Sequence, residues 1–376
     1  MITEIRFQNF KSLRDFSCSL SRLTVIVGPN ASGKTSVLQG INYLSLVSRH
    51  RTPIEILDVF AGPNSFDFLH SSDGSRRMLL SCFTREDGFN FSATKQERKT
   101  SRKSLPNSQW EAQTWLSPRG SKAHLPVHRI ADNNASKEIA AVAFLQFEPR
   151  ILASASYSSE LYPNIVSNGE GLASTVASIA LSRPEVFEVV QSNLRQIVPH
   201  FQRIRFRRVK IVRDESEIIR IGEEAITRKV AREYPADELL FDFDQRQEIP
   251  AANVSEGTIL ALGLLTVLHG SFSPRIILLD DIEKGLHPNA QRELIGMLRE
   301  ILKRQPDLQI VATSHSPYFL DFLDSTEVRL MAIGPDGFSR CGLLTDHPDF
   351  SKWKDEMTPG EMWSFFGEKW LVEEKV

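Results

Sequence analysis

The feature that constrains this chain most is a glycine-rich loop between a strand and a helix. It reads GPNASGKT over Gly28–Thr35 and fits the pattern GxxxxGK[ST]. The apolar run Leu23–Val27 before it is typical of a buried parallel strand, and Thr35–Ser48 after it has the pattern of a helix. The backbone N–H groups of such a loop and the helix N-terminus are suited to bind phosphate. The loop therefore predicts a nucleotide site on an α/β fold.

The positions of this loop have expected roles in binding ATP. Lys34 would bridge the β- and γ-phosphates, and the hydroxyl of Thr35 would ligate Mg²⁺. The glycines let the backbone curl around an oxyanion without interference from a Cβ atom. The residues expected to contact the nucleotide are Gly28, Pro29, Asn30, Ala31, Ser32, Gly33, Lys34, Thr35 and Ser36.

Two more buried strands end in polar side chains. Ile276–Leu279 is followed by Asp280 and Asp281. We expect Asp280 to hold Mg²⁺ through its water shell, and Asp281 to orient or deprotonate the attacking water. The apolar run that starts at Ile310 delivers His315, which we expect to contact the γ-phosphate, although a lone histidine is more often structural.

Further motifs identify a resemblance. NVSEGT over Asn253–Thr258 resembles the signature motif of ABC-type ATPases, and DIEKGLHP over Asp281–Pro288 resembles the ExxGLHP extension of Walker B in OLD-type ATPases. Ile5–Ser12 looks like the first strand of the same group, which includes RecF and the chromosome-maintenance ATPases. The tail from Pro359 to Glu368, with its GEMW sequence, resembles the end of small stand-alone, AAA-annotated relatives that lack a TOPRIM domain.

The resemblance implies an α/β fold. It would be a single ABC-type P-loop ATPase head over residues 1–376, with a mostly parallel sheet, an N-terminal antiparallel β part and an inserted helical lobe. Within it we expect a nucleotide-binding core at 1–48 plus 237–376. A variable basic insertion would occupy 49–141, and a helical lobe with a hairpin 142–236.

The resemblance also implies a homodimer that forms on ATP binding. Each ATP would lie between the phosphate loop of one chain and Ser255, Glu256 and Gly257 of the other. A helix N-terminus there would meet the γ-phosphate, so hydrolysis would release the dimer. Gln146, in a predicted strand over Val142–Phe147, is the candidate glutamine that senses Mg²⁺ and water. An ordinary edge-strand glutamine fits the sequence nearly as well.

One position departs from the family pattern. The family usually has glutamate where Asp281 stands, and aspartate is one methylene shorter. Because a misplacement of about 1 Å can slow a reaction roughly 100-fold, we expect slow ATP turnover that a partner or nucleic acid stimulates. Glu283 is a further catalytic candidate that could compensate. A protein that binds ATP without hydrolysing it remains an alternative.

The less regular parts of the chain carry weaker predictions. Arg76–Phe83 and Phe89–Thr94 have strand patterns, and the pattern over Gly169–Phe201 predicts a largely helical stretch. Arg203–Val212 with Glu217–Ile221 predicts a hairpin, with a bulge or turn where the alternation shifts at Arg208.

Two segments concentrate positive charge. Residues 76–129 hold eleven Lys or Arg against four Asp or Glu, with Trp110 and Trp115 interleaved, and this suits a segment that tracks a phosphate backbone. A surface insertion with no partner fits equally well. The second is an arginine stripe on one strand face, for which a solubilising role is the alternative. The candidate contacts for DNA, RNA or a protein partner are Arg203, Arg205, Arg207, Lys99, Arg102 and Lys103.

Composition narrows the class of protein. A net charge of −2 averages over these segments, so it does not exclude nucleic acid. The sequence has no run of 18 uncharged apolar residues, which predicts no membrane association. Three distant cysteines, Cys18, Cys82 and Cys341, predict a reducing, cytoplasmic setting.

The leading hypothesis is an ATP-gated dimeric switch that acts on nucleic acid or on a separate effector, a nuclease or toxin, in antiphage defence. The alternative is a RecF-like DNA-repair ATPase. An energising subunit of a membrane transporter fits less well, because the LSGGQ-type signature is absent and the phosphate loop lies far from Ser255.

Overall fold

The computed structural model describes most of the chain, in two compact units. The first comprises Met1–Phe144, Pro274–Ile295 and Ile301–Val376, and the second comprises Leu145–Ser273 and Gly296–Glu300. The described residues are 1–50, 55–56, 60, 70, 77–95, 110–118, 125–126, 133–221, 224–270, 273–284, 286 and 288–373.

An antiparallel sheet forms one layer of the first unit. Its strand order is β2-β1-β4-β5-β6-β7. Apolar side chains alternate along β1 and β2, so one face of the sheet is buried. The strands are β1 (Glu4–Phe10), β2 (Leu13–Ser19), β4 (Arg77–Phe83), β5 (Asp87–Lys95), β6 (Trp110–Pro118) and β7 (Leu125–Pro126).

A mostly parallel sheet forms the other layer, with the order β15-β14-β3-β13-β12-β8. β13 lies between β3 and β12 and is parallel to both, β14 is parallel to β3, and β15 is antiparallel to β14. The strands are β3 (Leu23–Val27), β8 (Val142–Leu145), β12 (Ile276–Leu279), β13 (Gln309–Ser314), β14 (Val328–Ile333) and β15 (Ser339–Leu343).

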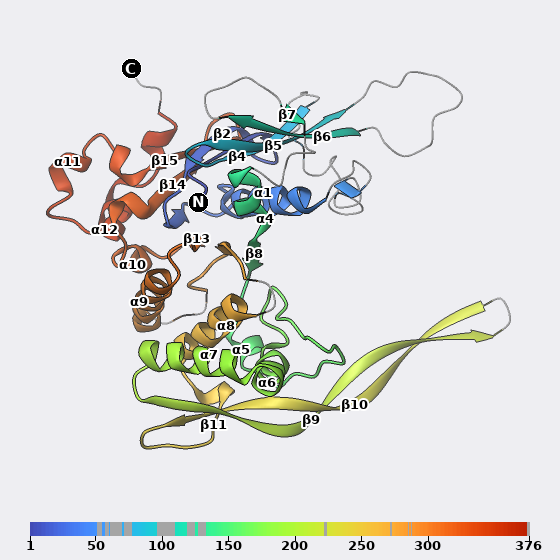
Figure 1. The fold of residues 1–376 in the computed structure, drawn as a ribbon. Coiled ribbons are helices and arrows are strands. Elements are labelled where there is room, and N and C mark those ends of the chain that lie inside the picture. Colours follow the sequence, from blue (N-terminus) through green and yellow to red (C-terminus); the bar gives the residue numbers. More distant parts are fainter. Residues whose placement is uncertain are drawn as a thin grey trace. The chain divides into compact units, whose positions relative to one another are not determined.

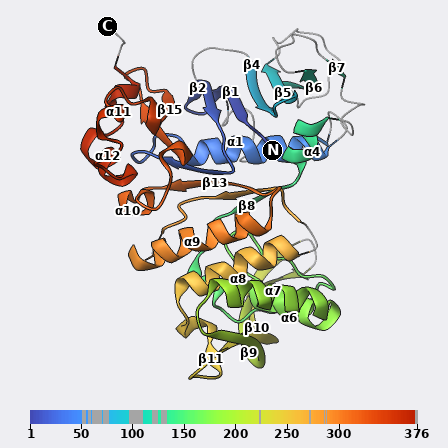
Figure 2. The same cartoon turned by 60° about the vertical axis from the view of Figure 1, so that its left-hand side comes forward.

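Helix α1 (Lys34–Arg49) runs between these two sheets in both views (Figures 1 and 2). Its buried residues join one apolar core with Phe7 and Phe10 of β1 and Val311 of β13. A Cβ atom at Gly40 would lie 2.7 Å from the ring of Phe7, so this glycine allows α1 to approach β1 closely. The helix that follows the phosphate loop is therefore enclosed on two sides. Its neighbour in this layer is α4 (Asn134–Ala140).

The C-terminal part of the first unit packs around a short helix. α12 (Pro359–Phe366) begins with a capping box formed by Thr358 and Glu361. Asp321 accepts hydrogen bonds from the Thr358 hydroxyl, at 2.6 Å, and from the N–H of Gly360, at 3.1 Å. A Cβ atom at Gly360 would lie 2.1 Å from the carbonyl oxygen of Pro317, so glycine is required in the GEMW sequence. The other helices here are α10 (Pro317–Leu320) and α11 (Phe350–Trp353), and α9 (Pro288–Arg304) is divided between the two units.

The second unit combines helices with a three-stranded antiparallel sheet of order β11-β10-β9. Figure 1 shows the far half of the β9–β10 ribbon extending beyond the helices of this unit. The elements are α5 (Pro149–Leu152), α6 (Leu172–Ser182), α7 (Pro184–Ile197), α8 (Glu256–His269), β9 (Phe201–Ile221), β10 (Glu224–Phe243) and β11 (Ile249–Pro250).

The hairpin prediction was wrong in its extent. β9 is one strand of 21 residues, and its partner is β10 rather than Glu217–Ile221. No register shift occurs at Arg208; the irregularity lies between Asp242 and Phe243. The charged run after Val212 imitates a turn, because the residues directly after it, 213–216, are charged or polar and are half-buried or exposed.

Two strands of the antiparallel sheet were also missed. β2 had no predicted counterpart, and β6 lies inside the expected surface insertion, where it pairs with β5 along its whole length. Trp110 is 7% exposed and therefore packs in the core, whereas Trp115 lies under the guanidinium of Arg77. Strands β4 to β6 thus belong to the first compact unit, and α8 falls in the second unit with the helical lobe.

The arginines of the stripe on β9 pair with acidic neighbours. Arg203 and Arg205 each donate to Asp242 at 2.7 Å, and Arg207 pairs with Glu238 at 2.7 Å. Asp242 is 3% exposed. Its burial opposes ionisation, but hydrogen bonds from Arg203, the N–H of Glu248 and Arg205 outweigh this and lower its pKa to about 2.

This buried carboxylate makes stability depend on pH. Because the folded-state pKa lies below the ordinary value of 3.8, its contribution is full above pH 4 and is lost as the pH falls toward 2. We expect Asp242→Asn to lower the free energy of unfolding at pH 7 by about 2 kcal/mol, measured by urea unfolding. The difference in the free energy of unfolding between Asp242→Asn and the wild type should be smaller at pH 3. Glu233→Gln, which removes the exposed pair with Lys210, is the control and should change stability by less than about 0.5 kcal/mol. A difference independent of pH would contradict the assignment.

None of the helices in the described part of the chain is long and apolar enough to cross a membrane.

Candidate functional site

A cavity of about 300 Å³ lies at the phosphate loop in the first unit. Three adjacent parallel strands end beside each other here: Val27 of β3 is in register with Ser314 of β13, and Leu279 of β12 with Ala312 of β13. The residues that follow these strand ends therefore converge. The cavity is lined by Ser12, Asn30, Ala31, Ser32, Gly33, Lys34, Thr35, Ser36, Asp281 and His315.

The phosphate loop has the backbone that its glycines predict. Gly28 and Gly33 have φ values of 153° and 97°, in the region that favours glycine. A Cβ atom at Gly28 would lie 2.2 Å from the carbonyl oxygen of Met331. The Lys34 ammonium donates to the carbonyl oxygens of Gly28 and Pro29, both at 2.9 Å. The loop is thus closed around its own lysine at the start of α1.

Asp280 accepts hydrogen bonds from two hydroxyl groups. Thr35 donates to its Oδ1 atom at 3.1 Å and Thr313 donates to the same atom at 2.8 Å. Thr313 also accepts the N–H of Asp281 at 2.8 Å. Thr313 is fully buried in β13, so this one hydroxyl fixes both carboxylate-bearing residues against the neighbouring strand.

Asp281 and His315 face each other. The Nε2 atom of His315 lies 3.3 Å from Oδ1 of Asp281, and both side chains are partly exposed to the cavity. Asp281 has a φ of 47°, a left-handed conformation that is uncommon for a residue other than glycine. Strained backbone of this kind often occurs at functional sites.

Glu283 lies behind His315. Its Oε1 atom accepts the backbone N–H of His315 at 2.5 Å, and the residue is 9% exposed. Its buried Oε2 atom has no hydrogen-bond partner among the described residues. Glu283 is thus placed to hold the backbone that carries His315, which differs from the direct catalytic role expected from the sequence.

Lys34 is a buried cation among acids. Burial lowers its pKa, and the charges of Asp281, Asp280, Glu283 and Glu368 oppose that effect. Glu368 comes from the C-terminal tail, where it accepts the indole N–H of Trp363 at 3.2 Å. The GEMW tail therefore contributes an electrostatic interaction to the phosphate loop.

The residues present fit ATP with Mg²⁺. Gly28 and Gly33 allow the loop to pack closely against Met331 and Ser339, where Cβ atoms would collide, and Lys34 supplies a positive charge. The Thr35 hydroxyl and the Asp280 carboxylate are hard oxygen ligands of the kind that Mg²⁺ takes. Bound there, the ion would neutralise phosphate charge.

Three contributors to this site were not predicted. Ser12 lines the cavity, and Thr313 fixes both aspartates. The Ser339 hydroxyl donates to the carbonyl oxygen of Ser32 and is hydrogen-bonded to the Ser12 hydroxyl, both at 2.8 Å. No local motif marks them, because each acts across strands that are distant in sequence.

Ser255, Glu256, Gly257 and Gln146 lie in the second unit. Ser255 caps α8 in the second unit, where its hydroxyl accepts the N–H of Thr258 at 3.2 Å, followed by Glu256 and the buried Gly257. Gln146, in the same unit, donates its backbone N–H to Ser167. Their approach to a nucleotide stays a prediction. Lys99, Arg102 and Lys103 lie outside the described residues.

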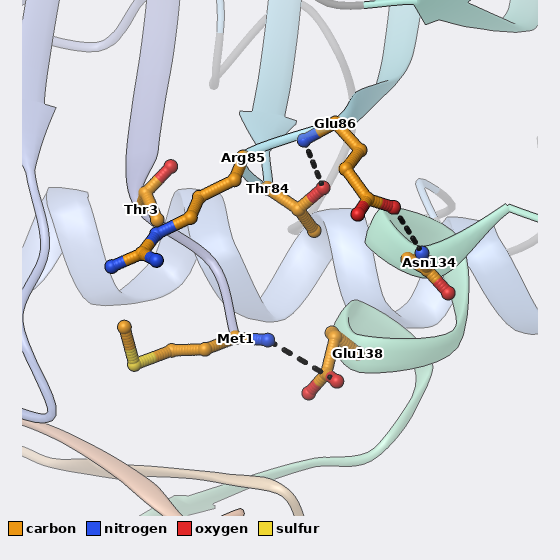
Figure 3. Close-up of a pocket in the computed structure, with 7 residues that line it drawn as sticks. All are labelled: Met1, Thr3, Thr84, Arg85, Glu86, Asn134 and Glu138. Carbon is orange, nitrogen blue, oxygen red and sulfur yellow. Dashed lines mark hydrogen bonds and ion pairs between the residues drawn. The ribbon is translucent and has the colours of Figure 1, made fainter.

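A second cavity, of about 360 Å³, lies at the end of the antiparallel sheet (Figure 3). Glu138 of α4 is paired there with the amino group of Met1 at 3.2 Å and with Arg275 at 2.5 Å. Asn134 donates to Glu86 at 3.1 Å. Glu138 thus links α4 to Met1 and to Arg275, and Glu86 links it to the turn between β4 and β5.

Comparisons with known proteins identify both the family and the fold. Residues 23–321 match the family described as "AAA domain, putative AbiEii toxin, Type IV TA system". No curated protein sequence matches the chain at a significant level.

Solved structures with a similar fold are SMC heads. An SmcHead bound to the C-winged helix domain of ScpA has a TM-score of 0.51 and 12% identity, over 91% of this chain and 97% of that one. A Smc head domain with an extended coiled coil, bound to the C-terminal domain of ScpA derived from Pyrococcus furiosus, has a TM-score of 0.50 and 12% identity, over 94% and 99%. The SMC head domain from Thermotoga maritima has a TM-score of 0.48 and 13% identity, over 91% and 98%. At these identities the likeness concerns the fold, which is the ABC-type α/β head expected from the motifs.

Proposed function

The chain belongs to the AAA-domain family of P-loop ATPases, and from this premise we propose that it is an ATP-binding and ATP-hydrolysing dimeric switch that gates a separate effector. The observation that carries the proposal is the convergence of Lys34, Thr35, Asp280, Asp281 and His315 at the ends of three parallel strands.

In this proposal each group has one task. Lys34 and the loop N–H groups bind the phosphates, while Thr35 and Asp280 hold Mg²⁺. The backbone N–H of Asp281 donates to Thr313, and its carboxylate orients the attacking water. His315 contacts the γ-phosphate. The short Asp281 side chain favours slow turnover, and a multiple-turnover rate above about 10 per second would contradict this expectation.

A protein effector is favoured over nucleic acid at the β9–β10 ribbon. Arg203, Arg205 and Arg207 already pair with Asp242 and Glu238, so little uncompensated charge is left there for a polyanion. The family description names a toxin system, and two of the similar SMC heads are bound to a domain of another protein. These features support a toxin or nuclease partner in a cytoplasmic defence role.

Dimer formation is tested at Ser255. Ser255→Asp keeps an oxygen that can cap α8, because aspartate is as good an N-cap as serine, but it adds a negative charge facing a γ-phosphate. We expect this variant to bind ATP as a monomer, to lose ATP-dependent dimers in light scattering, and to lose turnover at least 10-fold.

Ser255→Asn is the matched control, since it preserves the cap without the charge. It should retain dimers under the same conditions. Undiminished ATP-dependent dimers in Ser255→Asp would argue against the proposed interface.

A further inference from the structure

Two cysteines from opposite ends of the sequence line one cavity. Cys18 belongs to β2 and Cys341 to β15, which are edge strands of different sheets in the first unit. Both cysteines are free, and the Cys18 thiol donates to the carbonyl oxygen of Ser19 at 3.5 Å. A cavity of about 230 Å³ is lined by both residues and by Arg329, so a small solute can reach the pair.

The same face of β15 also contacts the phosphate loop. Ser339 and Cys341 are two residues apart and therefore point to one side of the strand. Ser339 donates its hydroxyl to the carbonyl oxygen of Ser32 at 2.8 Å, and its N–H to the carbonyl oxygen of Ser12 at 2.9 Å. The contact between β2 and β15 thus continues directly into the loop that binds phosphate.

We propose that Cys18 and Cys341 are an oxidative modification site, at which a peroxide forms a reversible disulfide that links β2 to β15. Both side chains line the same small cavity, so a bond of roughly 2.0 Å between the sulfur atoms can form by movement of the two side chains within it. The link restrains the strand that carries Ser339.

Cys18 is the thiol that attacks. Interaction with the Cys341 side chain lowers the pKa of Cys18; burial opposes this, and the positive charge of Arg329 adds to it. Arg329 is fixed there by its hydrogen bond to the carbonyl oxygen of Ser19 at 2.8 Å. Cys82 differs, because burial raises its pKa far above the usual range.

The chemistry is balanced with hydrogen peroxide as the oxidant. The Cys18 thiolate attacks one peroxide oxygen, the O–O bond breaks, and hydroxide leaves, giving the sulfenic acid. The Cys341 thiol then attacks the Cys18 sulfur, and the sulfenic oxygen leaves as water with the thiol proton. The two sulfurs lose two electrons, which reduce the peroxide to two molecules of water.

Mass spectrometry of the full-length protein tests the site. After brief treatment with hydrogen peroxide and alkylation of the remaining thiols, we expect a species with one alkylated cysteine, Cys82, and a cross-linked peptide containing Cys18 and Cys341. Dithiothreitol should restore three alkylated cysteines. Cys18→Ala and Cys341→Ser should each abolish the cross-link, whereas Cys82→Ala should retain it. A peroxide-treated wild type that alkylates at Cys18 and Cys341, or that forms only links between molecules, would overturn the proposal.

Hydrogen exchange tests the link to the phosphate loop. Exchange of the β15 peptide that contains Ser339 should slow at least threefold in the oxidised wild type. Peroxide should leave it unchanged in Cys18→Ala. Unchanged exchange in a cross-linked wild type would overturn the restraint on β15.

Discussion

Lys34→Ala is expected to reduce ATP turnover at least 100-fold and to remove detectable ATP binding at micromolar nucleotide. The variant lacks the only ammonium in the loop, and the carboxylates of Asp280 and Asp281 would then face the phosphates without that charge to offset them. Phosphate release and equilibrium binding of a labelled ATP analogue measure the two effects.

Lys34→Met separates loss of charge from loss of packing. It keeps the aliphatic stem that is buried at the start of α1, so its thermal unfolding should resemble that of the wild type while its ATP binding fails. Lys137→Ala removes an exposed lysine of α4 and should leave turnover unchanged. Wild-type turnover in Lys34→Met would exclude this loop as the nucleotide site.

Asp281→Asn is expected to lower the hydrolysis rate at least 100-fold while ATP affinity stays within about threefold of the wild type. Asparagine has nearly the same shape, and the backbone N–H of Asp281 would still donate to Thr313. The amide cannot accept a proton from water. Single-turnover hydrolysis and equilibrium binding distinguish the two quantities.

Glu283→Gln is the matched comparison for Asp281→Asn. A glutamine oxygen can still accept the N–H of His315, so a positioning role predicts a loss of less than about 10-fold. If Glu283→Gln instead loses as much as Asp281→Asn or more, with ATP affinity unchanged, Glu283 is the base and the assignment of Asp281 is wrong.

The site was predictable from sequence where its chemistry is local. Gly28–Thr35 carries its own strand, turn and helix start, so the pattern fixes both the structure and the ligand class. Asp280, Asp281 and His315 lie together beside this loop, as expected, because parallel strands present the residues after their carboxyl ends at one edge; their roles stay predictions. The fold class followed from these motifs together.

The contributions of Thr313, Ser12 and Ser339 could not be predicted in this way. Thr313 acts because β13 lies between β3 and β12, a strand order that no local pattern specifies. Ser12 and Ser339 meet across 327 residues of sequence.

The extent of the β9–β10 ribbon was missed for a related reason. Beyond Val212 its described side chains are mostly charged, with cross-strand pairs such as Arg232 with Glu215 at 3.5 Å, and they lack the apolar alternation that marks a half-buried strand.

The long-range hydrogen bonds of the first unit also affect when the protein matures during translation. Gln309 accepts the N–H of Ile2, donates to the carbonyl oxygen of Ile2, and donates to that of Ser21. The phosphate loop is thus synthesised well before the strands β12 to β15 that support it. Such non-local contacts delay folding, because the intervening chain must be ordered before they form. Nucleotide binding would therefore begin only after these strands have also left the ribosome.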